Sequence, residues 1–376
     1  MTRTPRPSIE IETLAEFDSR IAGGVASLEG WRLQDLDLRE RGEVLARTDA
    51  RGALFLGCRI DGAVEELLRA GGALVFPPAS PEAPVNVYRS RLYTPDELYD
   101  GLEHGSYART LDARAYAWAT RSSPGRHDLQ DLLARSLHDL AVDDALEELL
   151  GSRRVVGVMG GHATTRGSQA YLDAAVLGRA LARAGLTVAT GGGPGAMEAA
   201  NLGAYLAGHD DSALPEAVEL LASVPEFAPS VGAWAEVAFD VRRRWPSDST
   251  SLGVPTWFYG HEPPNVFASE IAKYFKNAIR EDVLLHVCTA GVVFLPGRAG
   301  TVQEVFQDAC ENYYAEQGSC APMVLVGVRH WTEQLPVWPL LQRLSLGRHM
   351  ETSVHLVDAL DEVVDLLAVA PQADSR

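Results

Sequence analysis

The second half of the chain alternates short apolar runs with longer amphipathic stretches, a pattern that begins near Gly151. Uninterrupted apolar runs predict buried strands, and apolar residues three or four positions apart predict helices. The expected strands lie near residues 154–159, 186–190, 254–259, 291–295, 322–328 and 353–357. The expected helices lie near residues 166–184, 195–207, 214–222, 229–243, 264–279, 301–315, 331–345 and 358–368. This alternation predicts a Rossmann-like α/β fold, in which helices cover both faces of a doubly wound parallel sheet.

The pattern before this point predicts a smaller N-terminal α/β domain. Strand-like runs at 53–60 and 73–77 flank a helical stretch at 61–70 and form a βαβ-like unit. Helical patterns follow at 94–102, 107–120 and 127–150. The last of these has leucines at the spacing of a packed helix: Leu129, Leu132, Leu133, Leu137 and Leu140. We see no internal repeat at the periods of solenoids or propellers, and expect a regulatory or assembly domain over 1–150 and a ligand-binding domain over 151–376.

Two glycine-rich segments each follow an expected strand and open an expected helix. The first contains Gly191, Gly192, Gly193, Gly195 and Met197, and the second contains Pro296, Gly297, Arg298, Ala299, Gly300 and Thr301. Glycine lets backbone N–H groups approach an anion, and the first turn of a helix offers unpaired N–H donors. A third strand end, with Gly160 and Gly161, would meet them outside the carboxyl ends of the sheet. We therefore expect a phosphate-binding site there.

The acidic composition limits the classes of ligand. The formal net charge is −18, which argues against nucleic acid or anionic membranes as partners, because both attract basic surfaces. No apolar run is long enough for a membrane span and no apolar signal segment follows Met1, so we expect a cytoplasmic protein. The four cysteines lack the short paired spacing of a zinc site. A small anion held by loop amides remains compatible with this charge.

The only two lysines, Lys273 and Lys276, fall in the expected helix 264–279. At helical spacing they share one face with Arg280. This pattern is typical of a solvated basic stripe, although Arg280 is also a candidate for ligand contact.

Residues 155–310 resemble the LOG (LONELY GUY) family of nucleoside 5′-monophosphate phosphoribohydrolases, formerly labelled lysine decarboxylases, and their larger bacterial relatives, the nucleotide monophosphate nucleosidases. The family pattern P-G-G-x-G-T-x-x-E is matched at Pro296, Gly297, Gly300, Thr301 and Glu304. The earlier glycine cluster with Met197 is matched as well, and Arg280 matches a family arginine after a one-residue insertion. Arg298 replaces the second glycine of the pattern, and it either adds a charged donor to the phosphate or crowds it. Glu281 replaces a lysine of the small plant-type members, which favours the larger bacterial nucleosidases.

The resemblance implies hydrolysis of the N-glycosidic bond of a nucleoside 5′-monophosphate such as AMP, which yields free base and ribose 5-phosphate. It implies Glu304 as the catalytic carboxylate and Arg280 as the residue that holds the phosphate or the base. A carboxylate suits this reaction because it stabilises an oxocarbenium-like cation and activates water. A guanidinium suits bidentate binding of an anion. The chemistry requires no metal or other cofactor, and family members assemble as homodimers or larger oligomers.

Other interpretations stay open. Thr301-x-x-Glu304 is also a capping box, in which Glu304 would bind the backbone at the start of a helix. A non-catalytic carrier could use the same cradle for a nucleotide or a molybdenum-cofactor-like ligand, and would have no need of Glu304. A Rossmann dehydrogenase is disfavoured, because the first turn lacks G-x-G-x-x-G. The remaining candidates are Glu198 as a helix cap or a partner of the helix dipole, Asn265 and Glu270 as ribose contacts, and His162 as an incidental loop residue.

Overall fold

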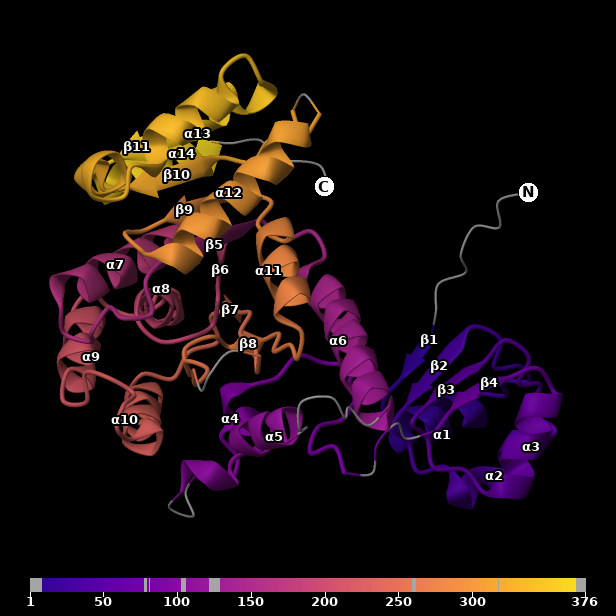
Figure 1. Ribbon diagram of the computed structural model, residues 1–376. Coiled ribbons are helices and arrows are strands. Elements are labelled where there is room, and N and C mark those ends of the chain that lie inside the picture. The colour runs from indigo at the N-terminus through magenta and orange to yellow at the C-terminus, as the bar shows by residue number, and fades with distance from the viewer. Residues whose placement is uncertain are drawn as a thin grey trace. The chain divides into compact units, whose positions relative to one another are not determined.

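The computed structural model describes residues 9–77, 80, 82–102, 106–121, 129–258, 262–316 and 318–369. Its contacts divide the chain into two compact units (Figure 1). The smaller unit comprises the chain up to Leu92 together with Ala117–Glu148, and the larger comprises Tyr93–Tyr116 together with the chain from Leu149. No helix within these described ranges is both long and apolar enough to cross a bilayer.

The larger unit is built on a seven-stranded parallel sheet with the strand order β11-β10-β9-β5-β6-β7-β8. The strands are β5 (Val155–Met159), β6 (Thr187–Thr190), β7 (Leu252–Gly253), β8 (Glu270–Ile271), β9 (Gly291–Phe294), β10 (Met323–Val326) and β11 (Val354–Val357). Every residue of β5, β6, β9 and β10 is buried, which explains their continuous apolar sequence. The predicted doubly wound α/β fold is confirmed.

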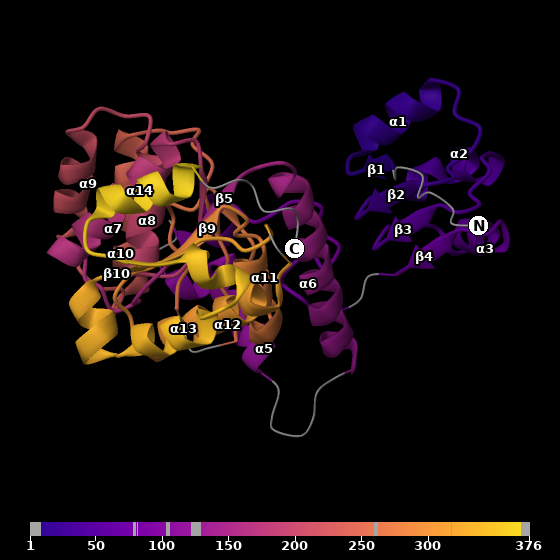
Figure 2. The same cartoon turned by 90° about the horizontal axis from the view of Figure 1, so that it is seen from above.

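Helices cover both faces of this sheet (Figure 2). Helix α7 (Gln169–Arg183) packs against α8 (Ala196–Tyr205) and α14 (Leu360–Val369), whereas α12 (Ala299–Tyr314) packs against α11 (Asn277–His286) and α13 (Val337–Ser345). Helices α9 (Ala213–Leu221) and α10 (Val231–Arg244) follow α8. The chain first runs outward from β5 to β8 and then returns to place β9 beside β5. This reversal of strand order opens a crevice at the carboxyl ends of β5 and β9.

The predicted helix at 264–279 is wrong. The chain is extended there and forms β8, and α11 begins only at Asn277. Residues 263–268 and 271–275 are all buried, so this segment has no solvent face of the kind that an amphipathic surface helix needs. The predicted basic stripe is therefore wrong as well, because Lys273 is 1% exposed and forms an ion pair with Asp112.

Two other predicted elements are shifted. The strand expected at 254–259 lies earlier in the chain, as β7. Among the described residues 254–258, Thr256 forms an isolated bridge with Tyr274. The helix expected at 331–345 is split into a π-helical turn at His330–Gln334 and α13, which begins after Pro336. A proline at this place has no N–H to continue the preceding helix.

The segment Tyr93–Tyr116, which the sequence grouped with the N-terminal region, packs within the larger unit. We call it the connecting segment. Its backbone pairs with β8 through an antiparallel bridge between Tyr93 and Ile271. It then forms α4 (Pro95–Leu98), a 3₁₀ turn (Tyr107–Arg109) and the start of α5 (Leu111–Thr120). The Asp112 carboxylate accepts a hydrogen bond from Trp257 Nε1 at 2.7 Å and lies 2.6 Å from Lys273 Nζ.

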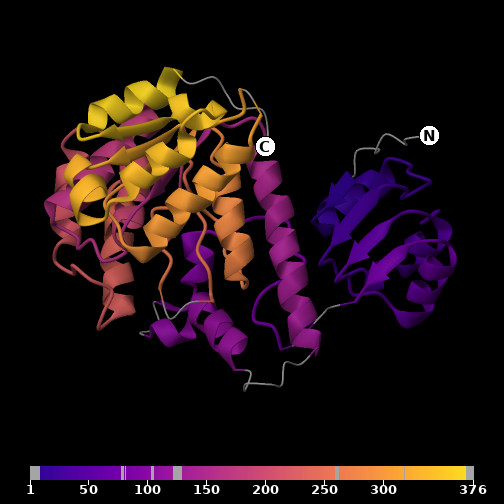
Figure 3. The same ribbon diagram turned by 45° about the horizontal axis from the view of Figure 1, so that its top comes forward.

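The smaller unit, drawn in indigo in Figure 3, contains a parallel sheet. The sheet has four strands in the order β1-β2-β3-β4. Its elements are β1 (Ile9–Ile11), α1 (Leu14–Ala22), β2 (Trp31–Gln34), α2 (Gly42–Arg47), β3 (Leu54–Leu56), α3 (Gly62–Ala70) and β4 (Leu74–Phe76). Three glycines with positive φ precede successive strands, and Gly30 N donates to Gly52 O while Gly52 N donates to Gly72 O. This part of the chain is therefore a stacked strand–helix repeat, which the sequence analysis missed because glycines and very short strands carry it.

Helix α6 (Leu129–Leu150) is present as predicted, but its leucines do not form the expected packed face. Leu129, Leu133 and Leu140 are exposed. Its buried positions include Ala134, Val142 and Ala145, smaller side chains that the leucine spacing did not indicate.

Candidate functional site

A cavity of about 1490 Å³ lies at the carboxyl ends of β5, β6 and β9 in the larger unit. Most of the predicted site residues line it: Gly160, Gly161, Gly191, Gly193, Met197, Arg280, Pro296, Gly297, Arg298, Ala299, Gly300, Thr301 and Glu304. The three glycine-bearing strand ends that the sequence singled out therefore meet at one place, as parallel strands around a reversal of strand order require.

Gly192 and Gly195 do not line the cavity but shape the first loop. Both have positive φ, 71° and 75°, a conformation that favours glycine. A Cβ on Gly195 would lie 2.5 Å from Gly161 O, so this position also needs glycine for close approach of the two loops. The Ala196 N–H donates to the same Gly161 oxygen at 3.1 Å. These two glycines are structural members of the predicted binding set.

The second loop places the start of α12 at the cavity. The helix begins at Ala299 and its N-cap is Arg298, whose exposed side chain lines the cavity. A Cβ on Gly297 would lie 2.1 Å from Thr301 Oγ1, whereas a Cβ on Gly300 would meet nothing within 4 Å. Gly297 is therefore required by packing. Gly300 leaves the unpaired N–H donors of the first helical turn open to the cavity.

The capping-box interpretation of Glu304 does not fit the helix. Thr301 is buried inside α12 rather than at its N-cap, and Arg298 at the N-cap makes no side-chain capping bond. Glu304 lies a turn further into the helix than a capping residue would. Its partly buried side chain lines the cavity instead.

The environment of Glu304 favours the protonated form. Burial raises the pKa of its carboxyl from 4.5 to about 7, with a further contribution from the Glu281 carboxylate, while the Arg280 guanidinium opposes this rise. Glu281 is itself held in place, since it accepts hydrogen bonds from Asn277 Nδ2 at 2.7 Å and from Gln303 Nε2 at 2.8 Å. A carboxyl group with a pKa near neutrality is suited to proton transfer at physiological pH.

Arg280 lies between the first glycine loop and Glu304. From the first turn of α11, its Nε donates to Val254 O at 2.7 Å and its Nη2 lies 3.4 Å from Gly191 O. These bonds hold the guanidinium plane at the cavity wall. A Cβ on Gly191 would lie 2.3 Å from Arg280 Nη2, so glycine at this position leaves the space that the guanidinium occupies.

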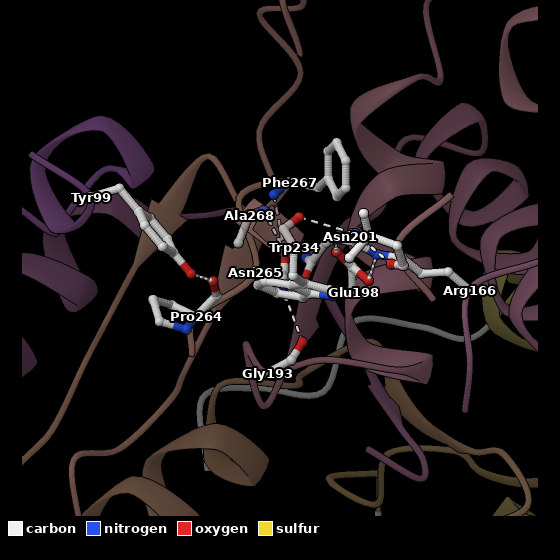
Figure 4. Close-up of polar contacts among 11 residues, drawn as sticks. Tyr99, Arg166, Gly193, Glu198, Asn201, Trp234, Pro264, Asn265, Phe267 and Ala268 are labelled. Carbon is white, nitrogen blue, oxygen red and sulfur yellow. Dashed lines mark hydrogen bonds and ion pairs between the residues drawn. The ribbon is translucent and has the colours of Figure 1, made fainter. Parts of the chain in front are cut away.

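Three weaker candidates do not line the cavity. Glu198 is not a helix cap but lies in the first turn of α8, as expected of a partner of the helix dipole. It is fully buried and forms an ion pair with Arg166, whose Nε lies 2.9 Å from Glu198 Oε2 (Figure 4). Asn265 is fully buried and binds the backbone of the first glycine loop, so it is not a ribose contact. Glu270 lies in β8 and does not line the cavity. Asn265 and Glu270 lie in the segment that was wrongly predicted as a helix, and the burial of Glu198 depends on packing that the sequence does not show.

Sequence reasoning missed several polar residues of the cavity, His330 and Glu262 among them, and left His162 aside. His330 and Glu262 line the wall, and His330 Nε2 lies 3.1 Å from Gly297 O. His162, considered incidental, also lines the cavity, and its Nδ1 is 3.8 Å from Glu262 Oε1. None of them lies in a recognisable motif, so only their position in the folded chain brings them to the site.

Comparison with known protein families gives a match at the level of a superfamily. Residues 153–209 match the model of the SLOG cluster4 family, one of the SLOG superfamily, which includes LOG-like proteins. The matched segment runs from β5 through α8 and contains the first glycine loop, but neither Arg280 nor Glu304. A comparison with curated proteins finds no match.

Similar solved structures include the molybdenum cofactor binding protein of the phototrophic bacterium Rippkaea orientalis. That similarity has 17% identity and a TM-score of 0.35, and it covers 57% of this chain and 96% of that protein. The Moco carrier protein of Chlamydomonas reinhardtii is also similar, with 19% identity, a TM-score of 0.36, and coverage of 57% of this chain and 98% of that protein. The functional proposal therefore rests on the cavity itself.

Proposed function

We propose that this protein hydrolyses the N-glycosidic bond of nucleoside 5′-monophosphates to free base and ribose 5-phosphate. The observation that carries the proposal is the position of Glu304. A partly buried carboxyl with a pKa near 7 faces a cavity that also contains Arg280 and an open helix N-terminus. A protein that only binds its ligand has no need of such a group.

Different residues would bind the phosphate and act on the sugar. The N–H donors of the first turn of α12 and the Arg298 guanidinium would bind the 5′-phosphate, because both offer positive charge at the open position beside Gly300. The nucleotide would then extend toward Glu304, which lies in the same helix. The phosphate anchors the substrate, and the carboxylate acts on the sugar.

Ionised Glu304 would stabilise the ribosyl cation that develops as the bond from C1′ to the base breaks, and would take a proton from the attacking water. The hydroxide adds to C1′, the departing base gains a proton from water, and Glu304 releases the proton it took, so that one water molecule is consumed for each bond broken. Arg280 supports this step because its charge lowers the pKa of Glu304 and so favours the ionised form at neutral pH.

The direct experiment is incubation with AMP, GMP, CMP and UMP, followed by chromatography for free base. We expect base release from at least one nucleotide and much slower release from adenosine, because adenosine lacks the phosphate anchor. Comparable turnover of AMP and adenosine would contradict the assigned role of the second loop. Tight binding of AMP without release of any base would instead support a non-catalytic carrier.

A further inference from the structure

The buried side-chain amide of Asn265 binds the backbone of the first glycine loop (Figure 4). Asn265 is fully buried, and its backbone N–H donates to Gly192 O at 2.8 Å. Its side-chain Nδ2 donates to Gly193 O at 3.2 Å and to Asn201 Oδ1 at 3.0 Å. One residue therefore binds two successive carbonyl groups of the loop.

The Asn265 side chain is itself held rigidly. Its Oδ1 accepts hydrogen bonds from the backbone N–H groups of Phe267 at 3.1 Å and Ala268 at 3.0 Å. Both hydrogens of Nδ2 are engaged, so the amide has one orientation that satisfies all its partners. Rotation of the side chain by half a turn would place an oxygen against Gly193 O.

Asn201 on α8 extends the network to the end of β6. Its Oδ1 also accepts a hydrogen bond from Thr190 Oγ1 at 2.7 Å, and its Nδ2 donates to Leu252 O at 3.3 Å. Thr190 Oγ1 in turn accepts from Gly192 N at 3.0 Å. The loop is therefore held by side chains from β6, α8 and the extended segment before β8.

The network engages three successive carbonyl groups of the loop. The carbonyl oxygens of Gly191, Gly192 and Gly193 are bound by Arg280 or Asn265. In a trans peptide the N–H points opposite to the carbonyl oxygen. Because Gly192 O is drawn toward Asn265, the N–H of Gly193 points the other way, and Gly193 lines the cavity.

We propose that Asn265 is a positioning residue for the ligand: it turns the carbonyl groups of Gly192 and Gly193 away from the cavity and leaves the Gly193 N–H to bind an anionic or polar ligand group. Carbonyl oxygens that faced the cavity would repel an anion. The identity of the ligand rests on the proposed function, whereas the role of Asn265 in ordering the loop does not.

The connecting segment also supports the hydrogen-bond network around Asn265. Tyr99, from the segment after α4, donates its hydroxyl to Pro264 O at 2.7 Å, and the bond is fully buried (Figure 4). Pro264 immediately precedes Asn265. The hydroxyl therefore anchors the backbone one residue away from the amide that holds the glycine loop.

The test compares Asn265→Asp with Asn312→Asp. The first change keeps size and shape but replaces the Nδ2 donor with a carboxylate oxygen that faces Gly193 O and Asn201 Oδ1. Asn312 is a matched control, since it is 1% exposed, donates to Ala321 O at 3.2 Å, accepts from Ala321 N at 3.0 Å and does not line the cavity. Asn265→Ala and Asn312→Ala form a second pair without buried charge.

Three measurements are made on each variant: the affinity for ribose 5-phosphate and AMP by calorimetry, hydrogen exchange of residues 190–197, and the thermal midpoint. We expect the Asn265 variants to lose about tenfold or more in affinity and to exchange faster at the loop, since buried carbonyls lose their donors. The Asn312 variants should keep wild-type affinity and loop exchange even where their thermal midpoints fall as far as those of the Asn265 variants.

Folded Asn265 variants with wild-type affinity and exchange would overturn the proposal, as would equal losses in the Asn312 variants. If the Asn265 variants do not fold, Tyr99→Phe decides: it removes one hydrogen bond, and we expect about threefold weaker affinity and faster loop exchange. Wild-type behaviour of this variant would overturn the proposal. Failure of AMP hydrolysis in the wild-type protein would contradict the proposed function and leave these binding results interpretable.

Discussion

At the scale of single residues, Glu304 has the most consequential environment. Its pKa of about 7 comes from burial and from Glu281, and Arg280 keeps it from rising further. The sequence predicted Glu304 as a candidate but left open whether it caps a helix or acts on a substrate. The structure removes the first option because α12 begins at Ala299, two residues before Thr301. The pKa shift itself depends on burial in the folded chain and could not be read from the sequence.

The rate of base release should depend on the ionisation of Glu304. We expect the rate to rise with pH through a midpoint near 7, because the ionised carboxylate stabilises the cation and accepts the proton from water. The check is a pH profile of the first-order rate at saturating AMP. A profile that is flat between pH 5 and 9 would show that another group controls the reaction.

The raised pKa of Glu304 also affects the stability of the folded protein. Between pH 4.5 and about 7 the folded protein keeps Glu304 protonated while the unfolded chain ionises it, so this group destabilises the fold progressively as the pH rises. Glu304→Gln should therefore melt at a higher temperature than the wild type at pH 8, with a smaller difference at pH 5. Thermal unfolding at both values tests this, and a lower midpoint at pH 8 would contradict it.

Arg298 is the departure from the family pattern whose effect the sequence left open. Its side chain is exposed at the cavity wall and at the N-cap of α12, so we expect it to aid phosphate binding. Arg298→Gly should weaken the affinity for ribose 5-phosphate by about tenfold, the value of one charged hydrogen bond. Arg343→Ala, at an exposed site on α13, is the control. Tighter binding by Arg298→Gly would mean that the arginine obstructs the site.

At the scale of elements, the start of α12 and the loop before it form the part of the site that the sequence predicted best. The strand, glycine and helix order of β9 and α12 is local, so it is visible in a short window. The segment between β7 and α11 was predicted worst. Its burial comes from elements far away in the sequence, including the connecting segment and α8, and such packing leaves no periodic signal.

The open position of Gly300 gives a prediction at this scale. Gly300→Val should fold as well as the wild type, because a Cβ there meets no atom within 4 Å and valine is no worse than glycine in a helix. It should lose more than about tenfold in affinity for ribose 5-phosphate, since the side chain fills the space beside the helix amides. Gly62→Val, in the first turn of α3 and equally open, is the matched control. Unchanged affinity would place the phosphate elsewhere.

At the scale of the whole molecule, the division of the chain is less simple than a boundary at residue 150. The connecting segment belongs to the larger unit, and its Asp112 neutralises a fully buried lysine there. Alternating strands and helices predicted the doubly wound fold, because that pattern spans the whole second half. The repeat of the smaller unit escaped prediction, since strands of three or four residues give little periodicity.

The Asp112–Lys273 pair should be essential to the larger unit. Asp112→Asn should lower the free energy of unfolding by about 3–5 kcal/mol, because it leaves the buried Lys273 ammonium without its charged partner. The double variant Asp112→Asn/Lys273→Met should recover much of this loss. Urea denaturation of the wild type and both variants tests the coupling, and an unaffected single variant would show that the pair contributes nothing.

The central claim is that Glu304 acts on the substrate rather than on the fold, and Glu304→Gln tests it most directly. The amide keeps the size of the side chain but cannot stabilise a cation. Calorimetry with AMP and chromatography for free base are performed on the same preparation. The proposed function predicts nearly unchanged affinity for AMP and a loss of base release by several orders of magnitude. Base release at the wild-type rate by the folded variant would contradict it.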